Sequence, residues 1–163
     1  MCTVSVALTA AGASMEGMKT FSQGNRLRAA TSQLESQIQL ARSSAAALSQ
    51  TVRFAIQPLD QGSCTLVHTG PKDACQCGAE GAAVCNAPGA EVLMIERHDA
   101  RTGVRIITNR VSIAFSGSEG TATPTATIKL TDSTGRSLHQ VVNVMGRTRT
   151  CSPAAVLSGV PAC

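Results

Sequence analysis

Three kinds of side chain in this sequence could take part in chemistry: cysteines, histidines and a pair of neighbouring arginines. Six of the seven cysteines lie beyond the N-terminal stretch that contains Cys2. So many cysteines in a chain of 163 residues are typical of an oxidising compartment, where an even number forms disulfides. We therefore expect disulfides, whose pairing the sequence leaves open, among Cys64, Cys75, Cys77, Cys85, Cys151 and Cys163.

Zinc binding is the alternative use of the central cysteines. Cys75 and Cys77 are separated by one residue, with Cys64 before them and Cys85 after them. That gap is shorter than the spacing usual in zinc knuckles. The sequence therefore favours disulfides over a metal site.

A disulfide between Cys151 and Cys163 is our most specific expectation for the cysteines. Proline and glycine between them, at Pro153, Gly159 and Pro161, can turn the chain back on itself. A loop of this size gains roughly 3 kcal/mol from closure in the chain-entropy model.

The histidines do not form a catalytic pattern. His68, His98 and His139 are far apart in sequence, in or beside predicted strands. A cysteine in a disulfide cannot serve a histidine as a nucleophile, and no glycine-rich phosphate loop, HExxH or GxSxG motif is present. The sequence predicts no enzyme, no metal and no cofactor, and we expect neighbouring backbone to satisfy His68 and His139.

Positive charge is concentrated in the second half of the chain. Residues 97–163 contain eight Lys and Arg against three Asp and Glu, whereas residues 1–96 contain six against seven. Arginine binds phosphate well through its planar guanidinium, and Arg147 and Arg149 stand two apart. Aromatic residues make up only 2% of the chain, which excludes a stacking platform for single strands. These arginines either hold their loop or meet the phosphates of a nucleic acid.

The front of the chain, residues 1–24, is expected to be part of a membrane or filament helix. Its first 15 residues contain no charge and no proline, but a bilayer span needs about 20 apolar residues. A cleavable signal peptide, with Ala11-Gly12-Ala13 as its cleavage site, is the alternative, although the basic n-region is missing. Glycines at 12, 17 and 24 could bend a helix here.

The head, residues 25–163, is expected to fold as one domain that begins with a helix. Apolar residues recur at steps of three and four, as on one helix face, at Leu27, Ala30, Leu34, Ile38, Ala41, Ala45 and Leu48. Strands are predicted at residues 51–56, 64–68, 92–96, 104–108, 111–115, 125–130 and 139–144. Residues 57–62 read as a turn and residues 70–90 as a long loop held by disulfides. Short strands at this spacing predict antiparallel pairing in an α+β fold.

Two motifs resemble those of the type IV pilin-like GspH/FimT/FimU family of minor pilins and pseudopilins. The helical stretch from Asn25 leads into Leu40-Ala41-Arg42-Ser43, and Val141-Val142-Asn143 leads into Gly146-Arg147-Thr148-Arg149. The second motif looks like the family's last strand and Gly-Arg-x-Arg loop, closed by a final cysteine. The resemblance implies a long N-terminal helix packed on an antiparallel head of two small sheets, with a disulfide-linked C-terminal loop.

The resemblance also implies a function. The chain would be a structural subunit of a type IV pilus or of a type II secretion pseudopilus. It would cross the bacterial inner membrane once, with its head in the periplasm, and its partners would be other pilins or pseudopilins and the inner-membrane assembly platform. The FimT-like branch implies an alternative: a DNA receptor for natural transformation, using Arg147 and Arg149 on double-stranded DNA without sequence preference.

One departure from the family concerns the N-terminus. Family members begin with a short basic leader and a cleavage-site glycine, followed by a glutamate before the membrane helix. Met1-Cys2-Thr3 would align a few residues past that glutamate. We expect either a misplaced start codon or a shortened chain.

Overall fold

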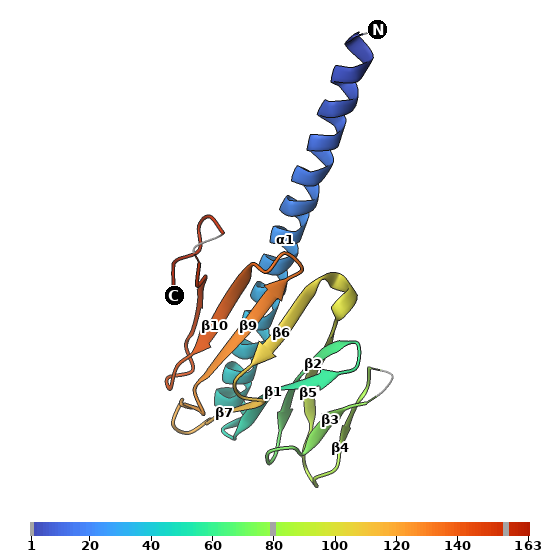
Figure 1. The fold of residues 1–163 in the computed structure, drawn as a ribbon. Coiled ribbons are helices and arrows are strands. Elements are labelled where there is room, and N and C mark those ends of the chain that lie inside the picture. Colours follow the sequence, from blue (N-terminus) through green and yellow to red (C-terminus); the bar gives the residue numbers. More distant parts are fainter. Residues whose placement is uncertain (1, 79–80, 155–156) are drawn as a thin grey trace.

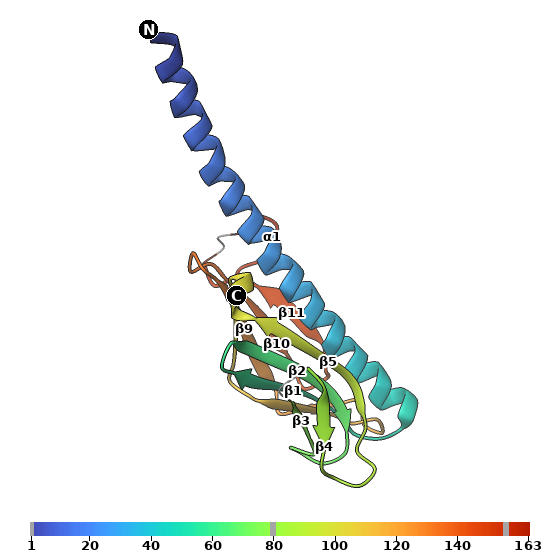
Figure 2. The same ribbon diagram turned by 90° about the vertical axis from the view of Figure 1, so that its right-hand side faces the viewer.

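One long helix and three antiparallel sheets make up the structure, a computed structural model that describes residues 2–78, 81–154 and 157–163. Its side chains are described at Met18 and from Thr20 onward, outside those gaps. Helix α1 (Cys2–Leu48) lies along one side of the sheets and extends far beyond them at its N-terminal end (Figures 1 and 2). The expected α+β fold, with a long helix on an antiparallel head, is confirmed.

Helix α1 runs without interruption through the glycines at 12, 17 and 24. Its stripe is buried against the sheets as predicted, with at most 1% exposure at Leu27, Leu34, Ile38, Ala41 and Ala45. The expectation for Leu48 is wrong, because this side chain is 48% exposed. Leu48 is the last helical residue, and Ser49 (φ 51°) reverses the chain immediately after it. The final turn therefore projects past the sheets.

The larger sheet has five strands in the order β5-β2-β1-β7-β8. Strand β1 runs to Leu59 and β2 begins at Gly62, so the turn between them is only Asp60 and Gln61. The predicted turn at 57–62 was therefore too long, because Pro58 and Leu59 remain paired in the β1–β2 ladder. The bounds are β1 (Val52–Leu59), β2 (Gly62–Thr69), β5 (Val92–Asp99), β7 (Ser112–Phe115) and β8 (Ala122–Thr123).

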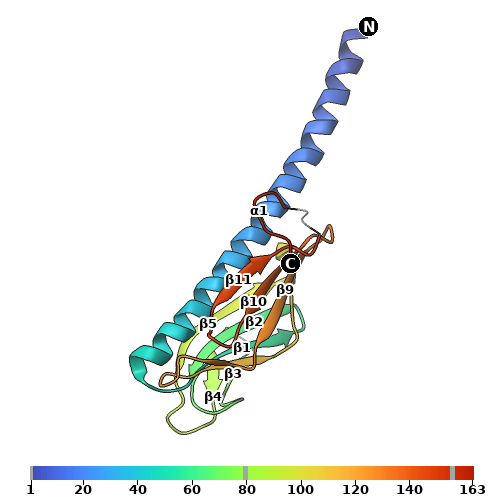
Figure 3. The ribbon, with the colours of Figure 1, turned by 90° about the vertical axis from the view of Figure 1, so that its left-hand side faces the viewer.

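The second sheet has four strands in the order β11-β10-β9-β6 and lies beside α1 (Figure 3). Its strands alternate buried and partly exposed residues, as expected for a sheet with one face on a core. The bounds are β6 (Val104–Thr108), β9 (Ala126–Asp132), β10 (Ser137–Val142) and β11 (Thr148–Cys151). A short 3-10 helix, η1 (Ala100–Thr102), precedes β6.

Two expectations about the C-terminal motif are corrected here. Val144, predicted in a strand, lies in the β10–β11 turn and is 54% exposed. Asn143 Oδ1 accepts hydrogen bonds from the backbone N–H groups of Met145 and Arg147, both at 3.0 Å, which closes this turn. The chain then returns as strand β11, so Arg149 lies in a strand rather than in a loop.

A two-stranded sheet, β3 (Cys75–Cys77) with β4 (Ala83–Cys85), lies within residues 70–90. The sequence predicted a loop there because each strand has only three residues. Cys75 and Cys85 are opposite each other in this ladder and are joined by a disulfide. Cys75 is buried in a small apolar cluster, against which Cys77, Ala83 and Cys85 pack.

The main core lies between α1 and the inner faces of the two larger sheets. Phe54 and Phe115, both at most 1% exposed, are its largest side chains. The helix approaches the β7–β8 connection closely at Gly117, where an added Cβ would lie 2.3 Å from the carbonyl oxygen of Ala45. Only glycine fits there, since backbone atoms cannot move aside. The C-terminal end of α1 is thereby fixed on the sheet.

Candidate functional site

All six cysteines of the head are paired in disulfides: Cys64–Cys77, Cys75–Cys85 and Cys151–Cys163. None of these sulfurs is therefore available as a thiolate for zinc or as a nucleophile. Within the described residues, no group of three His, Cys, Asp or Glu side chains could hold a metal ion.

The Cys151–Cys163 disulfide folds the C-terminal segment back onto the end of β11. Ser152, fully buried, donates its N–H to the carbonyl oxygen of Pro161 at 2.8 Å and accepts from the N–H of Cys163 at 3.2 Å. The closed loop follows the two arginines of the motif. It anchors the end of their strand but does not contain them.

Arg147 lies directly before strand β11 and Arg149 lies within it, and both side chains are exposed. Val141 is opposite Arg149, and the N–H of Asn143 donates to the carbonyl oxygen of Arg147, whose own N–H donates to Asn143 Oδ1. Because side chains alternate along an extended chain, both arginines project from the same outer face of the sheet. Among the described residues, neither guanidinium has a hydrogen-bond or ion-pair partner.

Sequence reasoning missed two basic neighbours of this pair. Lys129 on β9 and His139 on β10 are opposite each other on the same outer face, two strands and one strand away from Arg149, respectively. No carboxylate projects outward from β9, β10 or β11 beside them. Partial burial, and then the charge of Lys129, lower the pKa of His139. The sequence shows the alternation of residues along each strand. Only the register between the strands shows that these side chains lie on one face.

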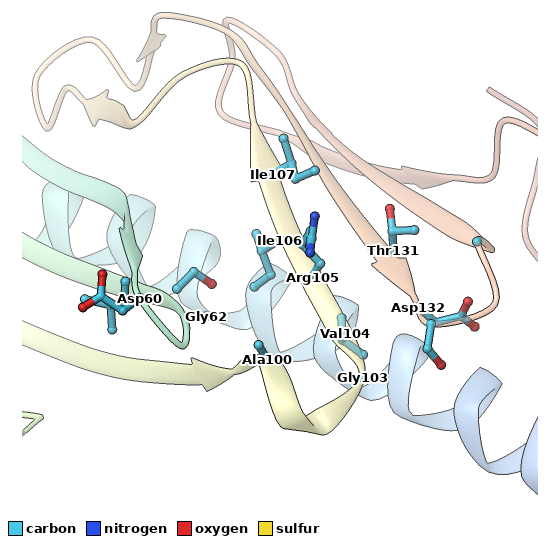
Figure 4. A pocket seen from close by; sticks show the side chains of 14 residues that line it. Asp60, Gly62, Ala100, Gly103, Val104, Arg105, Ile106, Ile107, Thr131 and Asp132 are labelled. Atoms are coloured by element: carbon cyan, nitrogen blue, oxygen red, sulfur yellow. The ribbon is translucent and has the colours of Figure 1, made fainter.

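A crevice of about 750 Å³ separates the two larger sheets. Figure 4 shows its wall along β6, with Val104, Ile106 and Ile107, facing the β1–β2 turn that contains Asp60. Strand β6 is an edge strand of its sheet. The described lining contains no histidine and no cysteine, so the crevice has no base or nucleophile of these kinds.

Asp132 borders this crevice, but its carboxylate is fully engaged. Burial opposes its ionisation, yet hydrogen bonds from Thr134 and Arg136 outweigh that effect and hold the pKa of Asp132 below its usual value. Its Oδ2 lies 2.8 Å from Arg136 Nε, and its Oδ1 accepts from Thr134 Oγ1 at 2.7 Å. This side chain organises a turn and is not free for proton transfer.

A second pocket, of about 580 Å³, lies between α1 and the β5–η1 segment. Arg26, Arg97, Arg101 and His98 line it together with one carboxylate, Glu96. Burial lowers the pKa of His98, against a weaker opposing effect of Glu96. The carboxylate of Glu96 accepts from the side-chain amides of two glutamines of α1, Gln33 and Gln37.

His68 is buried and its Nδ1 lies 2.9 Å from the carbonyl oxygen of Thr69, as expected of a histidine satisfied by neighbouring backbone.

Comparison with known families shows where this architecture occurs. The family model described as "Type II transport protein GspH" matches residues 30–146, well over half of the chain. This chain belongs to the GspH family. The resemblance seen in the sequence motifs is therefore confirmed. Arg147 and Arg149 lie just beyond the range that the GspH model matches.

A solved structure with a similar fold is the minor pseudopilin EpsH from the Type 2 Secretion System of Vibrio cholerae. The TM-score is 0.50 at 12% identity, and the alignment covers 78% of this GspH-family chain and 98% of EpsH. At this identity the likeness shows the fold alone. Among curated protein sequences, none matches the chain.

The described part of α1 contains no segment that is long and apolar enough to cross a membrane.

Proposed function

We propose that this GspH-family chain is a minor pseudopilin, a structural subunit of the pseudopilus of a type II secretion system. One observation carries the proposal: part of helix α1 packs against the sheets, and the rest of the same helix extends beyond them. From Leu27 to Ala45, α1 buries its apolar stripe under the sheets, whereas its N-terminal part extends beyond them (Figure 1). A helix of 47 residues is about 70 Å long. Because the first 15 residues of the extended part contain no charge, other molecules should cover it.

The chain then divides into the front, residues 1–24, and the head, residues 25–163. The front is part of an inner-membrane helix that later packs in the filament core, and the head lies in the periplasm. Three disulfides suit that oxidising compartment. The partners are other pseudopilins and the inner-membrane assembly platform. The chain acts as a structural part, with no catalytic step and no cofactor.

The test is genetic and distinguishes a type II secretion system from a type IV pilus. In a strain that lacks this gene, we expect secreted enzymes to accumulate in the periplasm and the wild-type chain to restore their export. Surface pili and DNA uptake are measured in the same strain. Normal secretion together with lost piliation would overturn the assignment to secretion and place the subunit in a type IV pilus.

A second candidate function, sequence-independent binding of double-stranded DNA, is favoured by the outer face of the four-stranded sheet. Arg147 and Arg149 project there, and Lys129 lies two strands away on the same face, with no described carboxylate among them. Guanidinium groups spaced along an extended strand suit successive phosphates. Contacts of this kind carry no base information.

Duplex-binding measurements test this candidate. Replacing Arg147 and Arg149 by glutamine should weaken binding to unrelated duplexes by similar factors. It should flatten the plot of log affinity against log salt by about two units, since each phosphate contact contributes ~0.9. The control, R26Q/R101Q, removes the same charge at the other end of the head. Equal losses in both variants would mean that net charge alone attracts the DNA.

A further inference from the structure

The end of the head from which α1 emerges combines exposed apolar side chains with arginines. Met18 and Phe21 are 74% and 72% exposed on α1. Before them in the sequence come 15 residues without charge, and Glu16 and Lys19 cancel in formal charge. Arg26 and Arg28 follow Phe21 within two turns of the helix. The order along the chain is therefore uncharged, exposed apolar, then basic.

Four arginines, which we call the arginine collar, lie at this level, either on α1 or on segments that contact it: Arg26, Arg28, Arg101 and Arg136. Arg28 donates to the carbonyl oxygen of Ser158 at 2.6 Å, and Arg136 to that of Thr20 at 3.1 Å. Both contacts tie the head to the helix. These two arginines are therefore held at a fixed height along α1.

Carboxylates beside the collar are largely engaged. Asp132 pairs with Arg136, and the carboxylate of Glu96 faces the amides of Gln33 and Gln37. Asp99 pairs with Arg101, but that pair is open to solvent, with side-chain exposures of 41% and 85%. Four arginines against three carboxylates leave positive charge, and Arg26 and Arg101 border the same pocket of about 580 Å³.

We propose that the arginine collar docks the head on an anionic phospholipid surface. Phe21 and Met18 enter the boundary between headgroups and acyl chains, and Arg26 and Arg101 bind lipid phosphates. Arginine suits this place because its guanidinium binds phosphate with two parallel hydrogen bonds while its stem covers apolar surface. The inference rests on the proposed function, in which the front of α1 lies in the inner membrane. It adds a second, electrostatic contact that sets how the head stands on that membrane.

Vesicle flotation of the full-length chain tests the collar. Two kinds of vesicle are compared: phosphatidylcholine alone, and phosphatidylcholine with phosphatidylglycerol. We expect the chain to bind both and to prefer the anionic vesicles, with a preference that falls as salt is added. In R26Q/R101Q the preference for anionic vesicles should fall roughly fivefold for each arginine removed, and binding to phosphatidylcholine alone should be unchanged. K72Q/R110Q, which removes equal charge from exposed positions at the opposite end of the head, should keep the preference.

The outcomes separate the collar from the proposed function. Binding to neither kind of vesicle would overturn both, since the front would not enter lipid at all. Equal binding of the wild-type chain to both kinds would overturn the collar and leave membrane anchoring intact. Equal loss in the two variants would also overturn it, because net charge alone would then explain the preference. Circular dichroism of each variant verifies that the head is folded.

Discussion

Asp132 Oδ2 and Arg136 Nη2 lie 2.7 Å apart, at the turn between strands β9 and β10. The same guanidinium donates to the carbonyl oxygen of Thr20 on α1. Gly24, on the next turn of the helix, has no side chain, and an added Cβ would lie 3.4 Å from Arg136 Nη1. The hydrogen bond from Arg136 to Thr20 thus joins the four-stranded sheet to the helix where the helix leaves the head, and the ion pair with Asp132 holds the Arg136 side chain in place.

Asp132→Asn should destabilise the head at pH 7 by about 1–3 kcal/mol, because buried donors lose their charged acceptor. The folded-state pKa of Asp132 lies below its unfolded value, so its contribution is present above pH ~4 and is lost as the pH falls through the folded-state pKa. Chemical denaturation at several pH values measures this. The difference between wild type and variant should shrink below pH ~4, whereas a difference independent of pH would contradict the argument.

Leu34→Ala should lower the free energy of unfolding by about 2–5 kcal/mol, because it leaves a cavity between α1 and the sheets. Leu40→Ala on the same helix is the matched control. The side chain of Leu40 is 37% exposed, so its removal should cost much less. Similar losses in the two variants, measured by urea denaturation, would mean that the stripe is not the buried face.

Gly117→Ala should destabilise the head by about 1–3 kcal/mol or more, as overpacking does. The new Cβ would lie 2.3 Å from the carbonyl oxygen of Ala45 and 2.6 Å from the N–H nitrogen of Gln50. Thermal unfolding measures the effect, with Ser118→Ala in the same turn as control. An unchanged melting temperature for Gly117→Ala would contradict the close approach of helix and turn.

Replacing both Cys151 and Cys163 by alanine should lower stability by roughly 3 kcal/mol, as expected for opening a loop of this length. Non-reducing peptide mapping of the wild-type chain should recover Cys151 joined to Cys163, Cys64 to Cys77 and Cys75 to Cys85. Under reducing conditions the wild type and the variant should unfold alike. Any other pairing would refute the arrangement around β3 and β4.

The sequence by itself determined the elements that repeat locally. Leu27, Leu34 and Ile38 recur at helical steps, and their burial follows from that period alone. Alternation likewise placed β9 and β10 to within two residues, since each strand has one face on the core. Family membership also followed from short motifs, because they lie within a contiguous stretch of chain.

Tertiary structure decided what depends on pairing between distant segments. Strands β3 and β4 exist because two disulfides bring Cys75 and Cys77 against their partners, which no local period encodes. Lys129 joins the surface of Arg149 only through the β9–β10–β11 register. The arginine collar assembles residues up to 110 positions apart, from Arg26 to Arg136. Hydrophobic burial is non-directional, so a sequence pattern tells which face of an element is buried, whereas the fit of whole elements decides what that face meets.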